Sequence, residues 1–268
     1  MASHFHDITS LQNNRVKDAV KLRDRRGREK QDRIIIDGTR ELSRAVDAGL
    51  PLVELFYCPE LVTDRAGEQL LKKIEPFDTE QFSVTAEVFE KLAYGERAEG
   101  VIGIARTPRP TLSDLVLPQN PLVAILVGIE KPGNVGAVLR SADGAGVSAV
   151  IIADGGTDLY NPNTIRASLG TIFSVPVRSA TGDQTLAWLR QKKLQIFAAR
   201  IDGAENYTAK TYLGPTAFLL GSEADGLPPH WNGPDIFNIS LPMLGAADSL
   251  NVSTTAAILF YEALRQRG

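Results

Sequence analysis

Short apolar runs alternate with amphipathic segments along the chain from residue 122 onward. Runs rich in Val, Ile, Leu and Ala are typical of strands buried on both faces of a parallel sheet. Between them, apolar residues recur three and four positions apart, which predicts helices with one apolar face. The expected strands are 122–128, 147–153, 195–200, 216–221 and 236–241. The expected helices are 135–145, 163–169, 184–192 and 250–267.

The first third of the chain shows the same alternation on a smaller scale. The expected strands are 33–37, 52–58 and 100–106, and the expected helices are 13–26, 39–48, 65–75 and 86–93. Four prolines lie between residues 107 and 121, which is typical of an extended connector. We therefore predict an α/β protein. Its expected parts are a smaller α/β domain over 1–106, a Pro-rich linker over 107–121 and a parallel-sheet domain over 122–268.

Composition restricts the class of protein. The 268 residues contain no run of eighteen apolar ones, so we predict no membrane-spanning helix. The first residues lack the charged and apolar regions of a secretory signal, so we expect a cytoplasmic protein. The single cysteine, Cys58, excludes an intramolecular disulfide and a cysteine zinc cluster. Because the chain also contains only three histidines, we predict no metal site.

Positive charge is concentrated near the N-terminus. Residues 11–33 contain nine Lys or Arg and four Asp or Glu, whereas the whole chain has a net charge of −3. A basic run is often only a solvated helix face. Against an acidic remainder, this one favours contact with the phosphates of a nucleic acid. The candidate contacts on the expected helix are Arg15, Lys17, Lys21, Arg25 and Arg26.

Three strands of the second domain end in polar loops that contain glycine. After strand 122–128, Asn134 lies at the start of a helix. Arg140 follows almost two turns inside that helix, where a guanidinium is costly to bury without an anionic partner. After strand 216–221, Gly221 lets a ligand approach the backbone closely, and Glu223 can organise the loop. Because α/β sheets bind ligands at such strand ends, these loops predict one shared site.

The third loop follows strand 236–241 and runs into the last helix. Asp248 or Ser249 can cap that helix through its side-chain oxygen. The free amides of the first helical turn then point into the loop and can bind polar groups.

The three loops resemble the three motifs of the SpoU or TrmH branch of the SPOUT RNA methyltransferases. Residues 134–140 match Asn-x-Gly-x-x-x-Arg, and residues 220–227 match Leu-Gly-x-Glu-x-x-Gly-Leu. Residues 242–252 match Pro-Met-x-Gly-x-x-x-Ser-Leu-Asn-Val. The resemblance covers about residues 120–267, and a looser one extends over the N-terminal third. Leu241 stands where isoleucine is commoner, which is a volume-conserving difference.

The resemblance implies a fold, a cofactor and an assembly. It implies a trefoil-knotted parallel-sheet SPOUT domain at the C-terminus, an N-terminal α/β domain that binds the RNA substrate, and a homodimer. S-adenosyl-L-methionine would lie in the knot. The implied cofactor-binding residues are Leu220, Gly221, Glu223, Ile239, Leu241, Ser249 and Leu250.

The resemblance also implies catalytic roles in methyl transfer to a ribose hydroxyl. Asn134 would orient the acceptor nucleotide or the polar end of the donor, and Arg140 would engage the RNA phosphate. Ser249 and Asn251 would lie beside donor and acceptor. Because a guanidinium gives up its proton reluctantly, we expect the hydroxyl proton to leave through Ser249, a phosphate oxygen or water.

Two further arginines extend the predicted RNA contacts. Arg40 lies in a segment that also resembles the family's N-terminal domain. Arg166 lies on the expected helix 163–169, where it can contact RNA or only cap and pack the helix.

We predict an S-adenosyl-L-methionine-dependent RNA 2′-O-ribose methyltransferase. Large-subunit (23S) ribosomal RNA is favoured because tRNA enzymes of this branch often lack an N-terminal domain. A tRNA ribose methyltransferase and a catalytically silent RNA-binding protein are the alternatives, whereas the missing Gly-x-Gly-x-x-Gly disfavours a dinucleotide enzyme.

Overall fold

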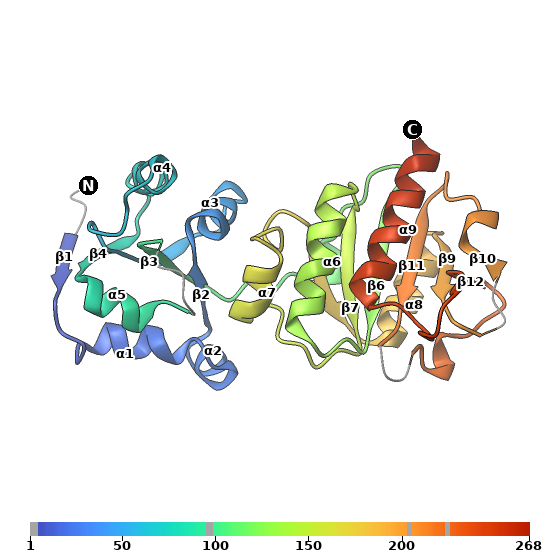
Figure 1. Ribbon diagram of the computed structural model, residues 1–268, viewed down its shortest axis with the longest axis horizontal. Helices are drawn as coiled ribbons and strands as arrows, with labels where there is room; N and C mark the ends of the chain where they lie inside the picture. Colours follow the sequence, from blue (N-terminus) through green and yellow to red (C-terminus); the bar gives the residue numbers. More distant parts are fainter. Residues whose placement is uncertain (1–4, 95–98, 203–204, 223–225) are drawn as a thin grey trace. The chain divides into compact units, whose positions relative to one another are not determined.

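The computed structural model describes residues 5–94, 99–202, 205–222 and 226–268 and has an α/β architecture (Figure 1). Contacts between residues divide the chain into two compact units. The first contains Met1–Pro108 and Asp158–Ser174, and the second contains Arg109–Thr157 and Val175–Gly268. Within the described ranges, no helix combines the length and the apolar content that crossing a bilayer requires.

The first unit is built on a five-stranded mixed sheet with the strand order β1-β4-β3-β5-β2. Strands β1, β4 and β3 run parallel, whereas β5 is antiparallel to both β3 and β2. The strands are β1 (Phe5–Ile8), β2 (Arg33–Asp37), β3 (Leu52–Tyr57), β4 (Glu80–Val84) and β5 (Val101–Arg106). The helices are α1 (Asn14–Lys21), α2 (Arg25–Gln31), α3 (Thr39–Asp47), α4 (Arg65–Ile74), α5 (Ala86–Leu92) and α7 (Pro162–Ala167).

One core cluster of the first unit lies between its sheet and two helices. Helices α1 and α5 lie side by side, as Figure 1 shows. Val16 of α1 and Phe89 of α5 belong to one buried cluster with Phe56 and Phe82, whose rings stack at 5.0 Å. Each fully buried side chain of this kind contributes about 1.5–3 kcal/mol. This cluster is therefore what holds the basic helix α1 on the sheet.

The expected single helix 13–26 is wrong, because the chain forms α1 and α2 with a turn between them. A Cβ on Gly27 would lie 1.9 Å from the carbonyl oxygen of Lys21. The two helices thus meet at a contact that only glycine permits. The hydrophobic pattern also does not predict β1 and β4, since each is short and contains only two apolar residues.

Residues 158–174 pack with the first unit although they follow a strand of the second. Arg28 of α2, which is 4% exposed, donates from Nε to Asp158 Oδ2 at 2.9 Å. Arg166 of α7 donates from Nη1 to the carbonyl oxygen of Tyr94 at 2.9 Å. The observed division therefore differs from the predicted boundaries, which give one continuous second domain. The contacts that cause the difference join residues far apart in sequence, and a local pattern does not reveal them.

Asp37, at the end of β2, is a buried carboxyl with a shifted pKa. Burial raises its pKa to about 6, although a hydrogen bond from Tyr94 N at 2.5 Å and the nearby Arg166 both favour the charged form. The folded pKa therefore lies above the value of about 4 for an unfolded aspartate. The protonated carboxyl stabilises the fold at low pH, and this contribution is lost as the pH rises from about 4 through about 6.

We expect Asp37→Asn to unfold at the same urea concentration as the wild type at pH 4. At pH 8 the variant should be more stable, by up to roughly 3 kcal/mol, because the neutral amide avoids the charge that the wild type must bury. Urea unfolding of both proteins at the two pH values measures this. A stability difference that does not change with pH would contradict the assignment.

The second unit contains a seven-stranded, entirely parallel sheet with the order β10-β12-β9-β11-β6-β7-β8. Its strands are β6 (Leu122–Val127), β7 (Ala149–Ala153), β8 (Val177–Ala180), β9 (Gln195–Ala199), β10 (Glu205–Asn206), β11 (Thr216–Leu220) and β12 (Ile236–Ser240). Its helices are α6 (Pro132–Gly144), α8 (Gly182–Gln191) and α9 (Val252–Arg267), with short 3₁₀ helices η1 (Leu112–Asp114), η2 (Tyr207–Ala209) and η3 (Pro229–Trp231). The pattern does not predict β8 and β10, the short strands at the two edges.

Helices cover both faces of this sheet. Figure 1 shows α6 and α9 side by side in front of it and α8 behind it. Alternate strand residues point to opposite faces. Val123 and Ile125 belong to a buried cluster with Leu186 of α8, whereas Phe218 faces Phe260 of α9 at 6.4 Å between ring centroids. The fully apolar strands predicted from the sequence are therefore explained by burial on both faces.

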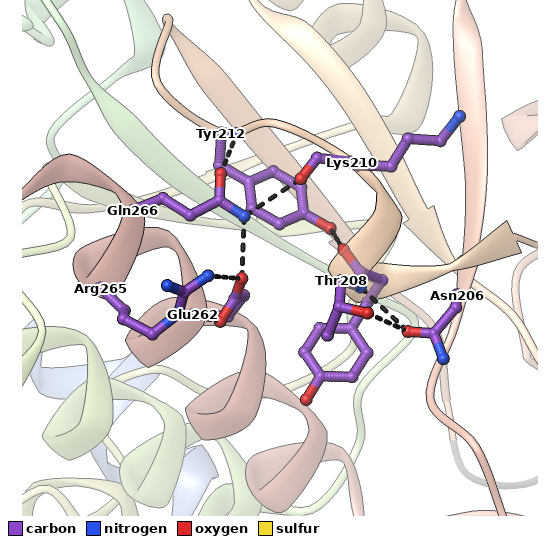
Figure 2. A network of polar contacts seen from close by, with 8 residues as sticks. Asn206, Thr208, Lys210, Tyr212, Glu262, Arg265 and Gln266 are labelled. Atoms are coloured by element: carbon purple, nitrogen blue, oxygen red, sulfur yellow. Dashed lines mark hydrogen bonds and ion pairs between the residues drawn. The ribbon is translucent and has the colours of Figure 1, made fainter.

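A polar network fixes the last turns of α9 (Figure 2). Gln266 Oε1 accepts a hydrogen bond from Tyr212 N at 2.8 Å, and its Nε2 donates to the carbonyl oxygen of Lys210 at 3.0 Å. Gln266 Nε2 and Arg265 both donate to Glu262 at 2.8 Å, and these hydrogen bonds, Arg265's first, lower the pKa of Glu262 to about 2. The far end of α9 is thereby tied to the segment between β10 and β11.

Candidate functional site

The parallel direction of the second sheet brings the carboxyl ends of its strands to one edge. Strands β12, β9, β11 and β6 are consecutive neighbours across the sheet. The three loops predicted to form one site follow β6, β11 and β12. They therefore leave the sheet at the same edge, where α/β proteins bind their ligands.

A cavity of about 400 Å³ lies at this edge. Five of the residues assigned to the cofactor line it: Leu220, Gly221, Leu241, Ser249 and Leu250. The further lining residues are Ala199, Arg200, Ile201, Asp202, Ser222, Gly226, Leu227, Met243, Val252 and Thr255. The volume and the mainly apolar walls with a few polar groups are typical of small-molecule sites.

The two remaining cofactor candidates are placed differently. Ile239 in β12 is fully buried and is not among the lining residues. Its carbonyl oxygen accepts a hydrogen bond from Arg200 N at 2.8 Å, so it holds the backbone of a residue that does line the cavity. Glu223 lies outside the described residues.

Gly221 is required by the fold of its own loop. Ser222 and Gly226 form a small antiparallel bridge, with backbone N–O distances of 3.2 and 3.1 Å. A Cβ on Gly221 would lie 2.3 Å from the carbonyl carbon of Gly226. The sequence predicts close approach of a ligand at this position, and the structure shows close approach of the returning chain.

The third loop ends at Asn251, which is the N-cap of α9. Asn251 Oδ1 accepts a hydrogen bond from Ser253 N at 2.9 Å. The prediction that Asp248 or Ser249 caps this helix is wrong, because the Asn251 side chain satisfies an amide of the first turn. Asn251 Nδ2 also donates to Asn134 Oδ1 at 3.3 Å, which joins the first and third loops.

Arg140 lies on the solvent-exposed side of α6. The guanidinium therefore avoids the cost of burial, because the buried residues of this helix lie at other positions of its turns. They are Val135, Gly136, Val138, Leu139 and Ala142. In the part of the chain that the structure describes, no side chain pairs with the Arg140 guanidinium. A free, exposed guanidinium is suited to binding a phosphate from solution.

The segment after β9 belongs to none of the three motif loops and was not expected at the site. Residues 199–202 nevertheless line the cavity, and they include the charged pair Arg200 and Asp202. Strand β9 lies between β11 and β12, so its end is necessarily close to the loops that follow them. The two charged residues at the end of a predicted apolar strand are the feature of the sequence that could have indicated this part of the site. Their closeness to the other loops depends on the strand order, which the sequence does not reveal.

The basic residues assigned to RNA in the first unit fall into two groups. The residues in ion pairs with acidic side chains, at 2.6–2.9 Å, are Arg15, Lys21 and Arg25. The exposed residues for which the described ranges contain no ion-pair partner are Lys17, Arg26 and Arg40. Arg166 is half-buried and takes part in the contact with Tyr94 described above.

The site can hold a ligand with a flat apolar part and a polar part. Leu220, Leu241 and Leu250 supply apolar walls, and the hydroxyls of Ser249 and Thr255 supply hydrogen-bonding groups. The carboxamides of Asn134 and Asn251 meet beside these walls, since Asn251 directly follows Leu250. The first and third loops therefore meet beside the cavity.

The sequence matches two known families. The profile of the SpoU rRNA methylase family matches residues 121–261, and that of the MRM3-like substrate binding domain matches residues 13–103. The 23S rRNA (uridine(2479)-2′-O)-methyltransferase of Streptomyces viridochromogenes is 28% identical over 255 residues, which cover 92% of this chain and 87% of that protein.

Solved structures resemble the whole chain. The crystal structure of an RNA 2′-O ribose methyltransferase is 38% identical, with a TM-score of 0.85, and the match covers 97% of this chain and 99% of the other. An AdoMet-bound rRNA methyltransferase from Sinorhizobium meliloti is 27% identical, with a TM-score of 0.86 and coverage of 98% of both chains. The chain belongs to the SpoU rRNA methylase family.

Proposed function

We propose that the protein is an S-adenosyl-L-methionine-dependent RNA 2′-O-ribose methyltransferase whose substrate is 23S ribosomal RNA. The observation that carries this proposal is the cavity at the strand ends, lined by the second and third motif loops, with Asn134 and Asn251 joined at 3.3 Å beside it. The substrate class is supported by the relative from Streptomyces viridochromogenes, a 23S rRNA 2′-O-methyltransferase that matches nearly the whole chain.

The residues of the cavity fit this methyl donor. The apolar side chains of Leu220, Leu241 and Leu250 suit the faces of an adenine. Backbone groups at the ends of β11 and β12 can hydrogen-bond its edge and the ribose. When bound, S-adenosyl-L-methionine supplies an electrophilic methyl group on a positively charged sulfur.

Three polar residues outside the lining of the cavity are suited to binding the RNA that accepts the methyl group. We assign Asn134 and Asn251 to orienting the target ribose, since alignment of two reactants supplies much of the rate gain in such transfers. Arg140 binds the neighbouring phosphate. The transfer would exchange the methyl–sulfur bond of the donor for a methyl–oxygen bond, with the sulfur keeping the electron pair, and the proton of the acceptor hydroxyl would leave to Ser249, to a phosphate oxygen or to water. A guanidinium is unsuited to accept that proton because it is already protonated at neutral pH.

We also propose the finer features that the family resemblance implies. A trefoil knot of the C-terminal domain is consistent with α9, which follows the strand β12 near one edge yet packs on α6. A homodimer is supported by exposed apolar residues on α9, since Tyr261 is 51% and Leu264 41% exposed. We further propose that the first unit is the RNA-binding domain and that the protein is cytoplasmic, which a ribosomal RNA substrate supports.

Incubation with labelled S-adenosyl-L-methionine and either 23S rRNA or tRNA tests the proposal. We expect label in the ribosomal RNA, on the 2′-oxygen of a ribose. The phosphodiester next to that ribose should then resist alkaline hydrolysis. Label confined to tRNA would favour the tRNA alternative. RNA binding without any label would favour the silent RNA-binding protein.

The free cations of the first unit are expected to set the salt dependence of RNA binding. We expect Arg26→Glu to weaken binding and to flatten the plot of log affinity against log salt, because a phosphate contact releases counterions. Arg25→Glu should have a smaller effect, since Arg25 is already paired with Glu29 at 2.8 Å. Filter binding between about 50 and 200 mM salt measures both slopes. An unchanged slope for Arg26→Glu would remove α2 from the interface.

A further inference from the structure

We infer that Arg200 and Asp202, directly after β9, form the subsite for the α-amino acid end of the methyl donor. This inference rests on the proposed function and deepens it, since it names the residues that recognise one part of the donor. Both residues line the cavity at the carboxyl edge of the sheet. Neither belongs to the three motif loops.

The Arg200 side chain is a nearly buried cation whose hydrogen-bonding groups are incompletely satisfied. It is 14% exposed, and its Nη2 donates to Asn232 Oδ1. Its Nε is buried and has no hydrogen-bond partner. Among the described residues, the carboxylate that comes near it is that of Asp202, at 3.8 Å from Nη1, which is too long for a hydrogen bond.

This environment favours an additional anionic ligand. A guanidinium has five N–H donors, and Asn232 is a neutral acceptor. The Asp202 side chain is 74% exposed and keeps most of its hydration, so it neutralises Arg200 only weakly. A carboxylate that entered the cavity would supply the short, charge-assisted contact that Arg200 lacks.

The two side chains together match the charges of an amino acid. An α-amino acid has a carboxylate and an ammonium group on the same carbon atom. Arg200 and Asp202 present the complementary charges 3.8 Å apart on one short segment. They are the charged residues among the described residues that line the cavity.

The position of the pair also fits the shape of the donor. The apolar walls at the ends of β11 and β12, such as Leu220 and Leu241, suit the adenosine part. Strand β9 lies between these two strands, so the charged segment that follows it borders the same cavity. The cavity therefore offers apolar walls to the neutral, flat end of the ligand and opposite charges to its zwitterionic end.

Calorimetry on the wild-type protein tests the subsite with three probes. S-adenosylhomocysteine has the complete amino acid end, its decarboxylated analogue keeps only the ammonium, and 5′-methylthioadenosine has neither group. We expect S-adenosylhomocysteine to bind at least about tenfold more tightly than either of the other two, because charge-assisted contacts are the stronger class of hydrogen bond. Equal affinities for all three would overturn the inference.

Two variants assign the recognition to the residues. Arg200→Gln should lose about tenfold in affinity for S-adenosylhomocysteine and nothing for 5′-methylthioadenosine. Asp202→Asn should lose about threefold for the compounds that keep the ammonium, since Asp202 is more exposed. Arg190→Gln is the matched control, because Arg190 pairs with Asp235 outside the cavity, and it should bind every probe as the wild type does.

The outcomes separate this inference from the proposed function. If Arg200→Gln binds S-adenosylhomocysteine and 5′-methylthioadenosine equally less well, Arg200 only supports the wall through Asn232, and the inference fails. If Arg200→Gln does not fold, the ratio of probe affinities in the wild type and in Asp202→Asn still decides it. A wild-type protein that binds none of the probes would instead overturn the proposed function.

Discussion

Arg140→Ala is expected to lower the rate of RNA methylation on the order of a hundredfold or more while leaving S-adenosyl-L-methionine affinity nearly unchanged. The reason is geometric. Arg140 lies on the exposed side of α6 and is absent from the lining of the cavity, so we expect its guanidinium to bind the acceptor and not the donor. Its removal should therefore affect the step in which the RNA is aligned.

Single-turnover methylation and calorimetry with S-adenosyl-L-methionine measure the two effects separately. Arg190→Ala is a suitable control, since it removes an exposed arginine whose ion pair with Asp235 lies outside the cavity. Because Arg140 is exposed, the variant should melt at the wild-type temperature. Loss of donor binding in a folded Arg140→Ala protein would contradict the role assigned to this residue.

Gly221→Ala is expected to lower both stability and donor affinity. The added methyl carbon would lie 2.3 Å from the carbonyl carbon of Gly226 and 2.7 Å from Leu227 N, and both are backbone atoms that cannot rotate away. The loop must therefore shift, which we expect to cost about 1–3 kcal/mol in the free energy of unfolding. Since Gly221, Gly226 and Leu227 all line the cavity, donor affinity should fall at least about tenfold.

Thermal unfolding and calorimetry of Gly221→Ala measure these losses. Gly214→Ala is the matched control, because no heavy atom lies within 4 Å of the position of its Cβ and Gly214 lies outside the cavity. It should behave as the wild type in both assays. A Gly221→Ala protein with full stability and full donor affinity would show that the loop tolerates the displacement. The close approach of Gly226 to Gly221 would then not determine the shape of the site.

Elements with a strong local pattern were predicted closely. The predicted strand 122–128 is β6 at Leu122–Val127, and the predicted helix 39–48 is α3 at Thr39–Asp47. In both cases the apolar spacing of neighbouring residues is sufficient, because burial on two faces or on one face leaves a direct trace in the sequence. The short edge strand β10 at Glu205–Asn206 leaves no such trace, since both of its residues are polar and exposed.

The candidate site was predicted in part. The loop residues Gly221 and Leu250 line the cavity, and Asn134 meets Asn251 across 117 positions of sequence. The contribution of Arg200 was missed because it depends on β9 lying between β11 and β12. The sequence alone also left open whether Arg140 is buried, because the small residues near it do not reveal which side of α6 is covered.

The sequence by itself determined the alternation of strands and helices, the three strand-end loops and the family to which they belong. These features depend on residues close together in the chain, whose spacing records local geometry and burial. Only the tertiary structure decided which strands are neighbours, that residues 158–174 pack with the first unit, and which charged side chains enter the cavity. Such contacts depend on which distant segments are brought together when the apolar faces are buried, and many pairings satisfy the same local pattern.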